Sequence, residues 1–200
     1  MTAQPFAGDL CISGDPTVDD IVNANPLALM IGMLLDQQIS IELAFTGPSR
    51  LAERIDGPLN ASTLAVMSVD DVVAVFAEKP ALHRFPASMA KRVHALASYL
   101  VEHHDGDPTL IWADAEDARQ LARRLKALPG FGPEKTKIFV AVLAKRFGVR
   151  PDGWQAAAGG FADDDVPRSV ADVTDPSVLD AIRAHRAAQK AAKGIVDKER

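Results

Sequence analysis

The stretch LPGFGPEKT, residues 128–136, decides the fold because it joins two segments that both have helical periodicity. Gly130 and Gly132 stand one residue apart, with Pro129 and Pro133 on either side of the pair. Glycine can adopt a positive φ and lets the backbone approach a ligand closely, and proline is favoured at the first position of a helix. The stretch therefore predicts a helical hairpin at about residues 119–147. Two interpretations remain open: a plain helix–helix turn, or a loop whose backbone N–H groups contact a phosphate.

The rest of the chain also predicts helices. Asp15-Pro16 and Asn25-Pro26 each place an N-cap residue before a proline, which is typical of a helix start. Residues 27–45, LALMIGMLLDQQISIELAF, are nearly all apolar and predict one central buried helix that ends at 46–48, Thr-Gly-Pro. No stretch alternates convincingly as a strand would, so we predict an all-α fold of about ten short helices. We expect a single unit over residues 1–200, with a C-terminal loop and helix over 151–200.

Composition excludes several classes of protein. The chain has 200 residues and a single cysteine, Cys11, which rules out a disulfide framework, a four-cysteine zinc site and a cysteine-ligated iron–sulfur cluster. No apolar run reaches the roughly 18 residues of a transmembrane helix, and the N-terminal MTAQPFAGDL lacks the basic and apolar regions of a signal peptide. We therefore expect a cytoplasmic monomer with no membrane partner.

Charge is distributed unevenly along the chain. The net charge is −5, yet residues 119–150 carry nine basic residues against the single acid Glu134. Such a basic segment can attract a polyanion even when the whole protein is acidic. A solvated basic helix face is the other interpretation of the same pattern.

A resemblance to a known family connects these features. The pattern Leu125-x-x-Leu128-Pro-Gly-Phe-Gly-Pro-x-Lys135-Thr136 matches the helix-hairpin-helix motif, in which two apolar residues fix the first helix and two glycines shape the turn. Over roughly residues 20–155 the chain resembles the helix-hairpin-helix-Gly/Pro-Asp (HhH-GPD) superfamily of DNA glycosylases, in particular its 3-methyladenine DNA glycosylase II branch. Residues 34–40, LLDQQIS, look like the QQ-S helix of that branch, and residues 88–97, SMAKRVHALA, sit where the branch has its lysine-bearing helix.

The resemblance implies a fold and a function. The fold would be a two-lobed helical one with a cleft between the lobes, and the partner would be double-stranded DNA, with the protein associated with the nucleoid. The activity would be base excision repair: hydrolysis of the N-glycosidic bond of a damaged, alkylated base after the nucleotide is flipped out of the duplex. A catalytically inactive DNA-binding protein on the same scaffold is the alternative, and a helical domain whose hairpin binds nothing is a third.

The resemblance also bears on strand cleavage. In the family, a lysine two residues past the second glycine marks the members that cut the strand through a Schiff base. Glu134 occupies that position here, and Lys135 follows one residue later. Because a shift of one residue turns a helical side chain by about 100°, we expect a monofunctional glycosylase without lyase activity.

The expected catalytic residue is Asp152. It follows Gly132 by twenty residues, the spacing that the superfamily leads one to expect, and it lies in the sequence Pro151-Asp152-Gly153. In the family, a carboxylate near the hairpin stabilises the positive charge that develops on the sugar. Pro-Asp-Gly is also an ordinary turn sequence, so a purely structural role is the competing interpretation.

Binding roles complete the expected site. DNA contacts are expected from the hairpin and the start of its second helix, at Gly130, Phe131, Gly132, Lys135, Thr136 and Lys137. The expected base pocket contains Gln37, Gln38 and Trp154, although the two glutamines also fit a buried structural amide pair and Trp154 a core tryptophan. The resemblance further implies a Na⁺ or K⁺ ion held by the backbone carbonyls of Lys126, Leu128 and Phe131, and no other cofactor.

Overall fold

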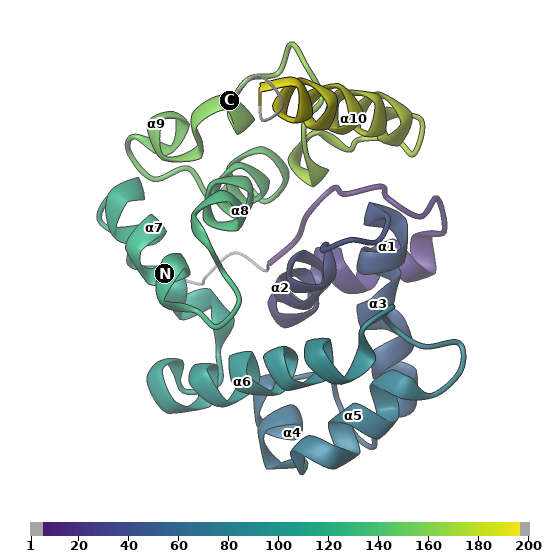
Figure 1. Ribbon diagram of the computed structural model, residues 1–200. Coiled ribbons are helices and arrows are strands. Elements are labelled where there is room, and N and C mark those ends of the chain that lie inside the picture. The colour runs from purple at the N-terminus through teal and green to yellow at the C-terminus, as the bar shows by residue number, and fades with distance from the viewer. Residues whose placement is uncertain (1–5, 197–200) are drawn as a thin grey trace.

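The structure is a computed structural model that describes residues 6–196, and within that range it contains helices and no β-strand (Figure 1). This confirms the predicted all-α class, while residues 1–5 and 197–200 of the predicted single unit lie outside the described range. The α-helices are α1 Pro16–Ala24, α2 Pro26–Leu35, α3 Ile41–Arg54, α4 Ala61–Val66, α5 Val69–Ala77, α6 Pro86–His104, α7 Ala118–Ala127, α8 Pro133–Arg146, α9 Trp154–Ala158 and α10 Val178–Val196. Three short 3₁₀ helices lie between them: η1 Pro108–Ile111, η2 Gly159–Phe161 and η3 Val170–Asp172.

The first two helices begin where the sequence predicts. The side chain of Asp15 accepts a hydrogen bond from the N–H of Thr17 at 3.0 Å, which caps α1. The side chain of Asn25 accepts from the N–H groups of Leu27 and Ala28 at 2.9 and 3.1 Å, which caps α2. Because side-chain oxygens satisfy the unpaired N–H groups of a first turn, these caps fix both helix starts.

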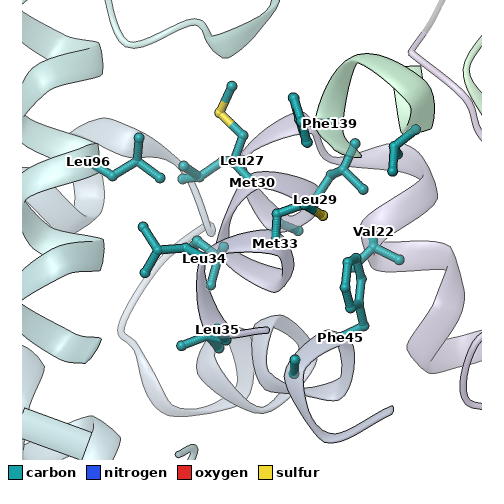
Figure 2. Packing of buried hydrophobic residues seen from close by; sticks show 14 of the residues in the cluster. Val22, Leu27, Leu29, Met30, Met33, Leu34, Leu35, Phe45, Leu96 and Phe139 are labelled. Carbon is teal, nitrogen blue, oxygen red and sulfur yellow. The ribbon is translucent and has the colours of Figure 1, made fainter. Parts of the chain in front are cut away.

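Helix α2 forms the centre of the core. All of its residues from Leu27 to Leu35 are buried, and Figure 2 shows side chains of neighbouring elements, among them Leu96 of α6 and Phe139 of α8, gathered around it. Gly32 allows α3 to pack closely, since a Cβ at this position would lie only 2.8 Å from the ring of Phe45. The C-terminal end of α2 is therefore held rigidly by packing on several sides.

The prediction of one helix over residues 27–45 is wrong. The chain leaves the helix at Asp36, takes a positive φ of 59° at Gln38, and starts α3 after Ser40, whose side chain accepts a hydrogen bond from the N–H of Leu43 at 3.3 Å. The predicted end at residues 46–48 is also wrong, because α3 continues to Arg54. Gly47 serves close packing instead of a helix end, since a Cβ there would lie 2.6 Å from Leu35 Cδ1.

The predicted helical hairpin is present as α7, a short turn and α8. Gly130 has a φ of 84°, in the region that favours glycine. The N–H of Phe131 donates to the carbonyl of Leu128 at 3.1 Å, which closes the turn. A Cβ on Gly130 would lie 3.0 Å from Leu34 Cδ1, so the turn is pressed against α2. The glycine is thus required both by its φ and by the approach of the two elements.

None of the helices in the described range is, taken alone, both long and apolar enough to cross a bilayer. Among the same described residues, one bent pair, α1 and α2 with an angle of 108° between them, reaches that length and composition.

Candidate functional site

A cavity of about 780 Å³ opens beside the hairpin turn. It is bounded by the end of α2 and the loop after it, by α6, by the first turn of α8, by the chain around η2 and η3, and by α10. Its charged wall residues are Asp36, Arg92, Glu134, Lys135, Arg168 and Arg186. Four of these six are Lys or Arg, so the cavity has more positive than negative charge and favours an anionic group of a ligand.

The hairpin presents unused backbone donors at this cavity. Within the described residues, no hydrogen-bond acceptor is found for the N–H groups of Gly130, Gly132, Glu134 and Lys135. Three of the four lie at the start of the 14-residue helix α8, where the helix dipole favours a negative charge. Gly132 has an ordinary φ of −75°, and a Cβ there would have no atom within 4 Å, so its backbone faces open space. These features make the turn suitable for contact with a phosphate.

The loop after α2 forms another part of the cavity wall. The Gln37 side chain donates to the carbonyl of Leu34 at 2.9 Å and accepts from Arg92 Nη1 at 2.8 Å. The carbonyl of Gln37 lies 3.0 Å from Nε2 of the buried His83, whose pKa is lowered because burial disfavours the charged ring. Both polar groups of the Gln37 side chain are therefore bonded within the protein. Gln38 is exposed at the cavity with a positive φ that residues other than glycine rarely adopt.

One carboxylate in the cavity wall is largely shielded from water. The side chain of Asp36 is 8 % exposed, and Arg186 of α10 reaches both of its oxygens, with Nη2 to Oδ2 at 3.1 Å and Nη1 to Oδ1 at 3.4 Å. Glu134, the other carboxylate in the wall, is exposed. Because charges interact more strongly where water is excluded, Asp36 is the stronger electrostatic group of the two.

Lys135 also faces the cavity. Its Nζ donates to the carbonyl of Met33, and burial lowers its pKa to about 8 even though nearby Asp36 favours the charged form. Lys135 is thus not turned away from the pocket, contrary to the expectation from the one-residue shift. At the start of α8 both Glu134 and Lys135 reach the cavity, and the long lysine side chain extends toward the end of α2.

The predicted DNA-binding residues divide into three groups. Gly130, Gly132 and Lys135 line the cavity. Phe131 and Thr136 are buried, and the ring of Phe131 packs edge-on against Phe139 with ring centroids 5.5 Å apart. Lys137 is exposed but lies outside the cavity wall.

Asp152 is not brought to the cavity. It is exposed in the turn before α9, and its carbonyl accepts a hydrogen bond from the N–H of Ala118 at 3.0 Å, at the first residue of α7. Because the ten residues of α7 span about 15 Å, this contact places Asp152 at the end of α7 away from the hairpin turn. Trp154, half-buried against the core at the start of α9, does not line the cavity either.

The expected cation site can be tested on its carbonyls. Within the described residues, the carbonyl oxygens of Lys126 and Phe131 accept no hydrogen bond, and that of Leu128 accepts only one, from Phe131. All three therefore keep lone pairs for a Na⁺ or K⁺ ion. In the same part of the chain, no group of three or more His, Cys, Asp or Glu side chains is arranged to hold a metal ion.

Five of the cavity's six charged residues were not assigned to the site from the sequence: Asp36, Arg92, Glu134, Arg168 and Arg186. Asp36 had a local signal, since it directly precedes the two glutamines that were assigned. Arg186 had none, because it is 150 residues away from its partner in the chain.

Comparison with known proteins adds no relative: no protein-family model, no curated protein and no solved structure matches this chain.

Proposed function

We propose that the protein is a monofunctional DNA glycosylase of base excision repair, with the two-lobed HhH-GPD type of fold and with the cavity as its cleft. The observation that supports this most directly is the position of the hairpin turn beside the cavity. The N–H groups of Gly130, Gly132, Glu134 and Lys135, which have no acceptor among the described residues, adjoin a space of about 780 Å³. A phosphate of the duplex binds at the turn, and the adjoining nucleotide, flipped out of the stack, enters the cavity. The volume lies within the range of small-molecule sites, so a damaged, alkylated base fits by size.

Base release without strand cleavage is proposed because Glu134 stands at the position where the resemblance places the lysine of the lyase members. Lys135 is not offered to the sugar as a free nucleophile, since its Nζ already donates to the carbonyl of Met33. A Na⁺ or K⁺ ion on the carbonyls of Lys126, Leu128 and Phe131 would add positive charge at the turn, where the phosphate binds.

The test is an assay of base release. Duplexes that each carry a single alkylated, deaminated or oxidised base are incubated with the protein and then divided into samples with and without alkali. The expected result is a strand break at one class of lesion only after alkali, and no covalent adduct after borohydride treatment with abasic DNA. If every lesion stays intact under low-salt conditions in which the duplex is bound, the glycosylase proposal fails.

A second candidate, DNA binding without chemistry, is favoured by one observation: Asp152, the expected acid, is exposed outside the cavity. Salt-sensitive duplex binding that Lys135→Ala or Lys137→Ala weakens, with no release of any base, would support it.

A further inference from the structure

The cavity holds a negative charge that Asp152 does not supply. Among the described residues lining it, Asp36 and Glu134 are the two that carry carboxylates, and only Asp36 is shielded from water. A carboxylate that is shielded from water stabilises a nearby cation more strongly than an exposed one. Asp36 therefore has the electrostatic character that glycosidic bond cleavage requires, and it has it inside the cavity.

The position of Asp36 is fixed from several sides. It follows directly on α2, whose last nine residues are buried, and its oxygens are held by Arg186. It also adjoins the hairpin, because Lys135 of the first turn of α8 bonds the carbonyl of Met33, three residues before Asp36. A phosphate at the turn is covalently joined to its sugar, so a nucleotide bound there brings that sugar toward Asp36.

We infer that Asp36 is the carboxylate that faces the sugar of the flipped-out nucleotide and stabilises its positive charge while the base departs. This inference rests on the proposed glycosylase function. The electron pair of the C1′–N bond leaves with the base, and C1′ becomes positively charged. A water oxygen then bonds to C1′ and gives up one proton, which the Asp36 carboxylate accepts before releasing it to solvent.

Arg186 has a separate role in this scheme. In the free protein its guanidinium pairs with Asp36, and it is 40 % exposed, so it can reach an incoming ligand. Because guanidinium binds phosphate oxygens well, it transfers to a DNA phosphate when the duplex binds. The carboxylate is then left to the sugar. Arg186 is accordingly needed for DNA affinity and not for recognition of the cationic sugar.

The experiment measures recognition of charge without requiring the natural lesion. Two duplexes are compared that differ at one nucleotide: a pyrrolidine abasic analogue, cationic at neutral pH, and a neutral tetrahydrofuran analogue. We expect wild type to bind the cationic duplex about tenfold more tightly or better. Asp36→Asn should reduce this ratio to about one, whereas Glu134→Gln and Asp152→Asn should leave it unchanged. If Asp36→Asn does not fold, the double variant Asp36→Asn with Arg186→Gln, which leaves no unpaired partner, is expected to show the same loss.

Several results would overturn the inference. It fails if wild type does not distinguish the two duplexes, if Asp36→Asn keeps the wild-type ratio, or if Asp152→Asn removes it. These failures leave the proposed function standing whenever wild type releases a base in the lesion assay. If no base is released from any lesion, the proposed function and the inference both fail.

Discussion

The buried amine of Lys135 leads to a prediction about stability and pH. The pKa of this side chain falls from 10.5 to about 8 in the folded protein because burial disfavours the charged form. The unfolded chain therefore holds one more proton than the folded chain between about pH 8 and pH 10.5. The free energy of unfolding of wild type should rise with pH across this window, with a slope approaching about 1.4 kcal/mol per pH unit. Over the whole window the gain is at most about 3 kcal/mol, and solvent at the partly exposed side chain reduces it.

The comparison that isolates this effect is Lys135→Met against wild type. Urea unfolding at a series of pH values gives the free energy of unfolding of each protein. In the difference between wild type and variant, the contributions of all other titrating groups cancel. Relative to the variant, wild type should be least stable below about pH 8 and should gain stability as the amine loses its proton. The exposed Lys137 provides the matched control, since Lys137→Met should show no such pH dependence. A difference that stays flat from neutral pH to pH 10.5 would refute the buried position of the Lys135 amine.

Three further substitutions separate stability from DNA binding around the hairpin. Gly130→Ala should lower the free energy of unfolding in a urea titration by about 2 kcal/mol, because the residue has a φ of 84° and its new Cβ would lie 3.0 Å from Leu34. An unchanged urea midpoint would contradict the close contact of the turn with α2. Gly132→Ser should leave the free energy of unfolding of the protein unchanged to within a few tenths of a kcal/mol, since serine is a good N-cap. The same substitution should weaken duplex binding about tenfold, because the new side chain obstructs the open backbone. Equal affinity in a fluorescence anisotropy titration would show that DNA does not approach this residue. Thr136→Val should stabilise the protein by about 1 kcal/mol, because the buried hydroxyl of Thr136 has no hydrogen-bond partner among the described residues. Duplex affinity should not change, and a loss of affinity would mean that the hydroxyl contacts DNA.

Local sequence signals were sufficient for the helix starts and the hairpin. Asp15 and Asn25 cap α1 and α2 as predicted, because an N-cap side chain acts within three residues of itself. Gly130 was recognisable as the turn residue, since the need for a positive φ is also local. The class of fold followed from these signals and from the absence of strand patterns.

The break after α2 shows where local signals end. The run of residues 27–45 has no glycine or proline at positions 36–40. Its polar residues there, with Ser40 as a candidate N-cap, are a weaker signal that is also compatible with one continuous helix. The glycine that does stand out, Gly47, lies inside α3 and packs against Leu35. A residue that permits close packing and a residue that ends a helix look alike in sequence, and only the tertiary contact distinguishes them.

The cavity depended still more on tertiary structure. The spacing from Gly132 to Asp152 matched the expectation, but spacing along a chain does not set direction, and the turn at Asp152 is attached to the start of α7. The pair of Asp36 and Arg186 joins residues 150 positions apart, a contact that no periodicity reveals.

The contact between the hairpin and a duplex is the central claim, and the backbone amide signals of the turn report on it most directly. Heteronuclear NMR spectra of the ¹⁵N-labelled protein would be recorded during a titration with a short duplex at low salt. We predict that the amide signals of Gly130, Gly132, Glu134 and Lys135 are among those that shift most, and that added salt reverses the shifts. Signals at residues 130–135 that stay in place while another surface responds to the duplex would contradict the account.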